Sequence, residues 1–250
     1  MREFFARFLN DTSYRSLTPS PQSQGAPHPP LEDAWPEQAA LIALPAGQEM
    51  AFPAAGLRET VEKRRSLRRY APDALSLGEL AGLLWLTQGV QKISKRPATL
   101  RTVPSAGARH ALETIVLVNR VDGLEPGLYR YVATRHALLR LEAPEDIAAR
   151  MAFACGEQEH VAQSAVTFAW YAVMERMSFR YSERSMRYIH LDAGHVCQNL
   201  YLAAEAVDCG VCAIAAFDDE GLNRLLGLDG VDRFVVYLGT VGRRPAQKEA

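Results

Sequence analysis

The stretch "EKRRSLRRY" (residues 62–70) has the residue types and spacing to bind an anion. Five basic residues lie between Lys63 and Arg69, with Ser66 among them. A guanidinium donates paired hydrogen bonds to phosphate oxygens, and a serine hydroxyl adds a neutral donor, so the spacing suits one phosphate group. The alternatives are a nucleic acid, a membrane surface, or a solvated charged stretch in which Lys63 and Arg64 only stabilise the last carbonyls of a helix.

A second candidate is the loop in "TVPSAGARHALETIVLV" (102–118), where small residues come directly before a predicted strand. The residues are Pro104, Ser105, Ala106 and Gly107. A loop of small side chains lets backbone N–H groups approach a flat ligand closely. The alternative is an ordinary turn that enters the strand.

Cys209 and Cys212 have the C-x-x-C spacing of a redox dithiol or of half a zinc site. A redox pair normally begins a helix, whereas this one leads into the apolar run "VCAIAAF" (211–217), a predicted strand. The sequence has no second C-x-x-C, and its six histidines include no H-x-x-x-H pair. We therefore predict structural cysteines and no metal site.

Other motifs and the overall composition narrow the function classes. The sequence contains no G-x-G-x-x-G after a strand, no P-loop and no G-x-S-x-G. Its net charge is −1, so the basic excess of 62–70 is local and a nucleic-acid partner is not expected. No apolar run approaches the roughly 20 residues of a membrane helix. The first ten residues are too short and too charged for a secretory signal, so we expect a cytoplasmic protein without a membrane partner.

The elements that position these residues follow from hydrophobic periodicity. Apolar residues at steps of three and four predict a long helix over 186–207. Ser76 and Glu79 form a capping box that starts a helix ending near Gly89. Further helices are predicted at 56–66, 145–155 and 218–228, and strands at 113–119, 128–132, 136–142, 164–173, 211–217 and 232–242. Helices and strands interleave irregularly, which predicts an α+β fold.

Residues 1–56 form a separate predicted segment, a proline-rich N-terminal arm. Six prolines lie between positions 19 and 36, together with Ser, Gln and His. This composition favours extended chain over a packed core. The arm is either disordered or wraps the body or a partner subunit, and the folded domain is predicted over 57–250.

Six motifs, in order, resemble the FMN-dependent nitroreductase superfamily, and the branch they resemble most is the SagB-type (azoline) dehydrogenases. The motifs are "KRRSLRRY", "LLWLTQGV", "PSAGARHALE", "LDAGHVCQNLYLAAEA", "CAIAAFDDEGLNRLLGL" and "VVYLGTVG". The resemblance covers residues 57 to 244. It implies a nitroreductase-like fold, in which helices flank a central, mostly antiparallel sheet. It also implies an intertwined homodimer with two flavins at the interface.

The resemblance also implies roles for particular residues. The "RRSxR" motif and a basic residue after the last strand grip the FMN phosphate, the "PSAG" loop lies along the isoalloxazine, and two residues after the long helix donate N–H groups to the flavin O4 and N5 edge. By position these are Arg64, Arg65, Ser66, Arg68 and Arg243 (with Arg244 as the alternate), then Pro104, Ser105, Ala106 and Gly107, then Ala215 and Ala216. A single phosphate pocket without a dinucleotide cradle favours FMN over FAD.

The sequence departs from the family pattern at three places. Many relatives have glycine at Ala216, and Arg109 and His110 replace residues that commonly border the substrate. Azoline-oxidising relatives carry a Lys-Tyr pair that handles the substrate proton, where this chain has Arg180 and Tyr181. Arginine stays protonated and is a poor general base, whereas Tyr181 can donate or orient a proton. The alternative is that this stretch is a polar loop without a catalytic role.

The leading hypothesis is an FMN oxidoreductase that transfers hydride through flavin N5 and acts on an azoline ring in a peptide or on another small acceptor. One alternative is an NAD(P)H-dependent nitro or quinone reductase. A second is a non-catalytic flavin-binding partner of a peptide-modifying complex. A nucleic-acid binder that uses residues 62–70 is the third, and the near-neutral net charge weakens it.

Overall fold

The computed structural model describes residues 1–46, 50 and 52–246. Residues 47–49 and 51 of the predicted arm, and residues 247–250 of the predicted domain, lie outside the described residues. Among the described residues, no helix is both long and apolar enough to cross a membrane.

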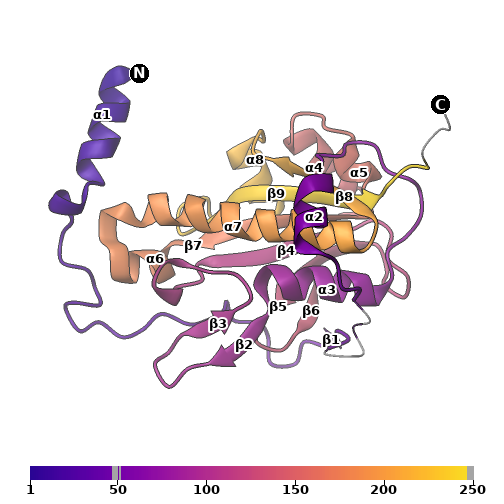
Figure 1. Cartoon of the computed structure of the whole chain (residues 1–250). Coiled ribbons are helices and arrows are strands. Elements are labelled where there is room, and N and C mark those ends of the chain that lie inside the picture. The colour runs from indigo at the N-terminus through magenta and orange to yellow at the C-terminus, as the bar shows by residue number, and fades with distance from the viewer. Residues whose placement is uncertain (47–49, 51, 247–250) are drawn as a thin grey trace.

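A seven-stranded sheet forms the centre of the molecule, and its strands follow the order β1-β6-β5-β4-β7-β9-β8 (Figure 1). Every pair of neighbouring strands in it is antiparallel. The strands are β1 (Leu41–Ala43), β4 (Leu112–Val118), β5 (Gly127–Val132), β6 (Ala137–Leu141), β7 (Val166–Val173), β8 (Cys209–Ile214) and β9 (Arg233–Arg243). All residues of β4 and β7 are buried, because helices cover both faces of the sheet. The predicted α+β architecture, a central antiparallel sheet flanked by helices, is confirmed.

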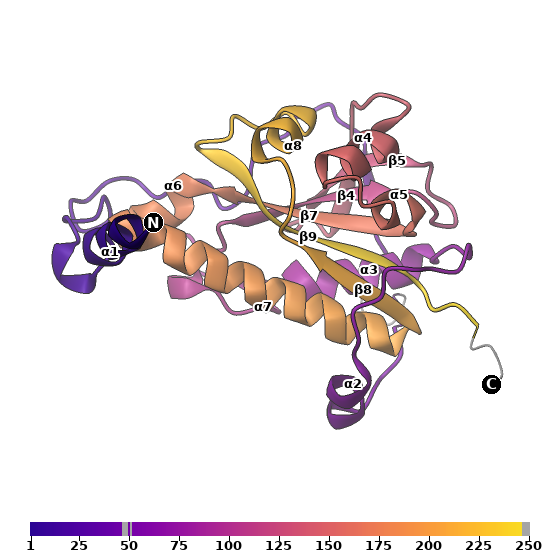
Figure 2. The ribbon, with the colours of Figure 1, turned by 90° about the horizontal axis from the view of Figure 1, so that it is seen from above.

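The helices form two layers, one on each face of the sheet (Figure 2). The long helix α7 (Ser185–Ala206) and α3 (Leu77–Gln88) cover one face. The other face carries α4 (Ile147–Ala154), α5 (His160–Gln163) and α8 (Asp219–Leu225), which enclose a second, smaller apolar core. The buried residues of α7 lie at steps of three and four along it, so one stripe of the helix packs on the sheet.

Local sequence patterns predicted the starts of α3 and α7 to within one residue. The capping box of α3 is formed in both directions: Glu79 N donates to Ser76 Oγ (3.2 Å), and Ser76 N donates to Glu79 Oε2 (2.7 Å). The long helix begins and ends one residue before its predicted bounds. These boundaries depend on contacts within a few residues, which sequence patterns report directly.

The predicted bounds of one helix and one strand are wrong, and so is the polar-loop alternative for the stretch around Arg180. The helix predicted over 56–66 is α2 (Leu57–Lys63), and the chain after it is extended against β8. The strand predicted over 211–217 covers 209–214 instead, because its pairing with β9 ends at Ile214 opposite Leu238. The stretch considered as a polar loop is the helix α6 (Met174–Tyr181) followed by a short 3₁₀ turn, so Arg180 and Tyr181 stand at a helix end.

The described part of the arm packs along the body of its own chain. Its strand β1 pairs with β6 at the sheet edge, with Leu41 opposite Leu139. The carboxylate of Glu32 accepts hydrogen bonds from the backbone N–H groups of Ala133 and Thr134. Asp33 binds side chains of the body as well. The arm has no apolar core of its own; these polar anchors hold it together with Leu44, which is buried in the main core of the body. Three further elements are α1 (Arg2–Asp11) and the hairpin of β2 (Val90–Ile93) and β3 (Thr99–Arg101), none of which the sequence patterns indicated.

Candidate functional site

The basic segment 64–70 lies along the edge of β8 (the strand at one end of the sheet in Figure 1). Leu67 N donates to Val211 O (2.8 Å), and the Leu67 side chain packs directly over Gly210, where a Cβ would come within 2.5 Å of it. The hydroxyl of Tyr70 holds the other end, with its oxygen 2.6 Å from Leu67 O and 2.7 Å from Thr240 Oγ1. Because neighbouring side chains of an extended segment alternate, this anchoring leaves Ser66 and Arg68 exposed.

Ser66 is positioned by Tyr201 of α7. The Tyr201 hydroxyl accepts a hydrogen bond from Ala213 N (3.0 Å) and lies 3.0 Å from Ser66 Oγ. With that N–H already aimed at its oxygen, the Tyr201 proton can point to Ser66, which leaves the Ser66 proton available to an anion. The Arg64 guanidinium lies over the Tyr201 ring, 5.2 Å from its centroid. Sequence reasoning missed Tyr201, because its spacing reads as one more position of an amphipathic helix.

Arg64 and Arg68 have no carboxylate partner among the ion pairs of the described residues. By contrast, Lys63 is paired with Glu59 (2.5 Å), and Arg65 donates to the carbonyls of Glu62 and Arg64. Two unpaired guanidiniums flanking an available hydroxyl fit a phosphate group. The structure thus places Arg64 and Ser66 on the same side chain, Tyr201, and turns Arg65 toward the backbone, while Arg68 is exposed two residues after Ser66.

Arg243 and its alternate Arg244 already bind carboxylates. Arg243 Nη2 lies 2.7 Å from Glu79 Oε2, and Nη1 donates to Val207 O (2.8 Å), so this side chain ties β9 to the start of α3. Burial lowers the pKa of Arg243, but the bond and charge of Glu79 outweigh it and raise the pKa overall. Arg244 is 2.5 Å from Glu205 Oε1. A phosphate role for Arg243 stays a prediction, and it requires exchange of an existing ion pair.

The loop 104–107 meets Arg180 and Tyr181, which the sequence separated by more than seventy residues. Gly107 has a φ of +57°, and a Cβ there would lie 2.7 Å from Tyr181 Oη and 2.8 Å from Arg180 Cδ. Glycine is therefore required both by the backbone conformation and by the close approach of α6. Ala106 N donates to Asp192 Oδ1 on α7 (3.2 Å), which fixes the loop on the long helix.

Burial shifts the pKa values of two titratable groups beside this loop. Burial, followed by the charges of Arg101 and Arg109, lowers the pKa of His110 to about 3, so its imidazole is neutral. Burial raises the pKa of Asp192 above its ordinary value, although bonds from Ser105 and Ala106 oppose the shift.

An open cleft of about 560 Å³ separates the arm from the end of α6. Gln22 N donates to Phe179 O (2.8 Å), so the arm forms one wall of this cleft and α6 the other. The lining residues are Tyr14, Leu17, Ser20, Gln22, Ser23, Arg180 and Tyr181. Both predicted catalytic residues thus face a cleft that the arm completes.

The two halves of the candidate site lie apart on one chain. Asp192, which holds the 104–107 loop, and Tyr201, which holds Ser66, are nine positions apart on α7, or about 13 Å along its axis.

Ala215 and Ala216 are exposed after β8, and within the described residues their N–H groups donate to no backbone carbonyl. Gln158 Nε2 donates to Ala216 O (3.2 Å). Exposed backbone N–H groups that donate to no carbonyl can bind a ligand with acceptor atoms along one edge.

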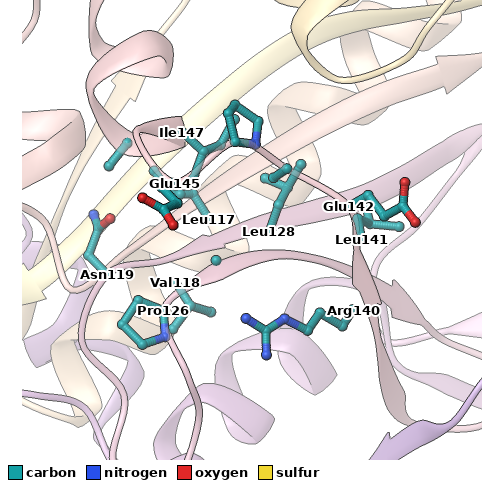
Figure 3. A pocket seen from close by; sticks show the side chains of 14 residues that line it. Leu117, Val118, Asn119, Pro126, Leu128, Arg140, Leu141, Glu142, Glu145 and Ile147 are labelled. Atoms are coloured by element: carbon teal, nitrogen blue, oxygen red, sulfur yellow. The ribbon is translucent and has the colours of Figure 1, made fainter.

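A larger cavity, about 640 Å³, lies on the face of the sheet that carries α4 (Figure 3). Asn119, Arg140, Glu142 and Glu145 border it, together with Leu117 and Leu128. It contains none of the predicted site residues, so its size does not make it the candidate site.

The cysteines behave as structural residues. All four are free and buried, and both members of the C-x-x-C pair lie inside β8. Burial raises the pKa of Cys209 to about 12, so the thiolate needed for redox chemistry is scarce at neutral pH. Among the described residues, no group of three His, Cys, Asp or Glu could hold a metal ion.

Comparison with known proteins decides the family. The model of the Nitroreductase family matches residues 61–243, which include the basic segment, the 104–107 loop and α7. The chain belongs to the nitroreductase family. This membership makes it an oxidoreductase of a family that generally binds flavin.

Two relatives of this chain have names that refer to different activities, a nitroreductase and a toxin-processing protein. The putative nitroreductase MJ1384 of Methanocaldococcus jannaschii is 34% identical over 188 residues, which cover 75% of this chain and 91% of that protein. The trifolitoxin-processing protein TfxB of Rhizobium leguminosarum bv. trifolii is 30% identical over 146 residues, 55% of this chain and 39% of its own length.

Solved structures support the same fold. A putative nitroreductase from Anabaena variabilis superposes with a TM-score of 0.64 at 32% identity, covering 76% of this chain and 38% of that one. The E. coli microcin synthetase McbBCD complex with truncated pro-MccB17 bound gives a TM-score of 0.61 at 17% identity, covering 98% of this chain and 94% of the matched chain. The second likeness speaks for the fold alone.

Proposed function

We propose that this nitroreductase-family chain binds FMN and works as a SagB-type dehydrogenase that oxidises azoline rings in a modified peptide. The observation that carries the proposal is the pair of unpaired arginines, Arg64 and Arg68, around the Tyr201-held hydroxyl of Ser66. This arrangement offers charged donors and one neutral donor to a single phosphate group. It fits a mononucleotide such as FMN, and the sequence carries no dinucleotide cradle.

The remaining predicted residues would contact the isoalloxazine. The N–H groups of Ala215 and Ala216 would donate to its O4 and N5 edge, and the Pro104–Gly107 loop would lie along the ring. When bound, FMN supplies hydride transfer at N5. We also propose, as the family resemblance implies, that each flavin lies at a homodimer interface and is contacted by both chains.

Proton handling would fall to Tyr181. Its hydroxyl reaches the loop beside Gly107, whereas Arg180 stays protonated and would serve as a fixed positive charge. In an azoline oxidation a proton leaves the ring as the hydride leaves its neighbouring atom. Tyr181 would orient a water or a substrate atom that takes this proton, and the permanent charge of Arg180 would stabilise the anionic character that develops there.

Two features support a peptide substrate. The cleft beside Arg180 and Tyr181 is open at the surface and walled by the arm, which leaves room for an extended chain. The names of two similar proteins, a trifolitoxin-processing protein and a microcin synthetase with its precursor bound, point to peptide modification in those systems.

The test begins with the absorbance spectrum of the purified protein. We expect flavin absorbance that acid or heat releases as FMN and no FAD. A colourless protein that takes up no FMN would overturn the proposal. Flavin-loaded protein is then incubated with an azoline-containing peptide in air, and the product is weighed by mass spectrometry: each oxidised ring loses two hydrogens. Tyr181→Phe tests proton handling, and we expect a lower kcat with unchanged FMN content.

An NAD(P)H-dependent nitro or quinone reductase is the second candidate, favoured by the similarity to MJ1384. It predicts that NADPH bleaches the bound flavin within the time of one turnover and that a nitroarene restores the colour. Flavin that neither NADPH nor an azoline peptide reduces would instead favour the third hypothesis, a non-catalytic flavin-binding partner.

A further inference from the structure

The N-terminal helix α1 exposes an apolar stripe that its own chain does not cover. At 100° per residue, Phe4, Phe5, Phe8 and Leu9 fall within about 140° of the helix surface, whereas Arg2, Glu3, Arg7 and Asp11 lie outside that arc. No residue of α1 is buried, and Phe4, Phe5 and Leu9 are each more than half exposed. An amphipathic helix with this pattern is stable when its apolar stripe packs on a partner surface.

α1 is nevertheless fixed in place, at the N-terminal end of α7. Arg184 Nη1 donates to Thr12 O (2.7 Å), and Arg187 Nη2 donates to Leu9 O (2.9 Å). These cations bind the last carbonyls of α1, where the helix dipole favours positive charge. The Arg187 guanidinium also lies 5.5 Å from the centroid of the Phe8 ring. The polar contacts orient α1 and leave its apolar stripe open.

The opposite end of α7 carries an apolar groove of about 520 Å³. Residues of α2, α3 and the last turns of α7 line it, together with Met50, Phe52, Pro53 and Ala55 of the chain's own arm. Figure 2 shows α2 projecting from the body at this end, while α1 stands at the other end. Leu57 and Val61 of α2 are more than half exposed, so the described residues of the chain leave this region uncovered as well.

A two-fold axis placed across α7 at Gly194 would bring these two surfaces together. Gly194, near the middle of α7, is exposed, and a Cβ built there would meet no atom within 4 Å, so a second helix can approach closely at this point. In an antiparallel crossing at Gly194, a residue seven positions before it faces one seven positions after it. Arg187, which holds α1, then faces the region of Tyr201 and Leu202 in the second copy. The α1 helix of each chain therefore arrives at the groove of the other.

We infer that α1 of each protomer docks with its phenylalanine stripe in the groove formed by α2, α3 and the C-terminal half of α7 of a second copy of this chain. The contact forms twice in a closed dimer, and each copy covers both apolar surfaces of the other. The inference rests on the proposed homodimer, and it names the surfaces that hold that dimer together. It also places the start of the arm of one chain close to Ser66 and Tyr201 of the other.

Disulfide trapping of the full-length chain tests the inference. Phe8→Cys and Leu202→Cys are combined in one chain and oxidised. The four native cysteines are buried, so they do not compete. We expect a covalent dimer on non-reducing gels, and single variants that stay uncrosslinked. The matched control combines Leu202→Cys with Phe153→Cys, because Phe153 is an exposed residue of α4 on the opposite face of the sheet.

A second measurement removes the apolar stripe without adding a bond. Phe4→Ser with Phe8→Ser should raise the dimer dissociation constant about 100-fold in sedimentation equilibrium, since each lost contact occurs twice. Phe153→Ser should leave it unchanged. The circular dichroism of the body should stay the same, because α1 buries no residue in its own chain.

Three outcomes would overturn the inference: a monomeric protein, a dimer in which Phe8→Cys crosslinks to itself, or a dimer in which the Phe8 and Leu202 pair stays uncrosslinked. Flavin absorbance is recorded on the same samples. A crosslinked but colourless protein keeps the docking and refutes FMN binding, whereas a yellow dimer without the crosslink does the reverse.

Discussion

Arg64 and Arg68 lie at the surface without a carboxylate partner among the described ion pairs, while Arg176 is buried and held by two carboxylates. Arg176 Nη2 lies 2.7 Å from Glu113 Oε1 and 3.4 Å from Asp33 Oδ1. Asp33 belongs to the arm and Glu113 to β4, so this second cluster joins the arm to the sheet. The first cluster is contiguous in sequence, and the second is assembled from distant positions.

The difference shows how surroundings decide the purpose of an arginine. A buried guanidinium must be paired, because an isolated charge in the interior is very unfavourable, and its partners then become part of the fold. An exposed guanidinium without a partner keeps its donors for a ligand. We therefore assign the buried cluster to stability and the surface cluster to phosphate binding, and the two assignments can be separated by measurement.

The largest effect is expected from the buried cluster. Arg176→Ala removes the cation that pairs with buried Glu113 and one of the two cations that bind Asp33, and it should lower the free energy of unfolding by about 3–5 kcal/mol. Urea denaturation measures it. The matched control is Arg150→Ala, which breaks an exposed pair with Asp146 on α4 and should change stability by less than about 1 kcal/mol. Equal effects in the two variants would remove the distinction between the clusters.

The surface cluster should show the opposite pattern. Arg64→Ala with Arg68→Ala should weaken FMN binding about 100-fold, or ~2.7 kcal/mol, and leave the free energy of unfolding of the flavin-free protein nearly unchanged. Quenching of flavin fluorescence on binding measures the affinity. The control is Arg69→Ala, an exposed neighbour in the same stretch. An unchanged affinity in the double variant would move the phosphate site elsewhere.

Stability should depend on pH through Asp33. Burial alone would raise the pKa of this carboxyl, but the bonds and charges of Arg233 and Arg176 prevail and lower it below its ordinary value of 3.8. A lowered pKa means that its stabilisation is present above the unfolded-state pKa and is lost as pH falls through the folded-state value. The midpoint temperature of thermal unfolding should therefore fall more steeply between pH 7 and pH 3 in the wild type than in Asp33→Asn. Parallel curves would contradict this.

The smallest predicted effect concerns Tyr201. Tyr201→Phe removes the hydroxyl that holds Ser66 and should weaken FMN binding about fivefold, the value of one hydrogen bond of ~1 kcal/mol. Tyr188→Phe, a tyrosine nearer the start of α7, is the control and should leave the affinity unchanged. If Ser66→Ala and Tyr201→Phe weaken binding independently rather than as a coupled pair, Tyr201 does not act through Ser66.

Parts of the fold were predictable because their causes are local. The capping box of Ser76 and Glu79, the periodicity of α7 and the buried strands β4 and β7 each depend on neighbours within a few positions. The predictions failed where a distant contact decides the conformation. The helix α2 ends early because Leu67 is held by Val211 on β8, and no pattern within residues 56–66 reports that bond.

The candidate site also has a part that the local sequence indicates and a part that depends on distant contacts. The sequence by itself determined the family and the basic segment around Ser66, because a run of arginines and a serine is visible without any structure. Only the tertiary structure decided which arginines are available: it pairs Arg243 with Glu79 and leaves Arg64 over the Tyr201 ring, without a carboxylate among the described ion pairs. It also brought Tyr201 to Ser66. Hydrogen bonds and ion pairs depend on distances of a few ångströms between residues that can lie anywhere in the chain, and the folded chain alone sets those distances.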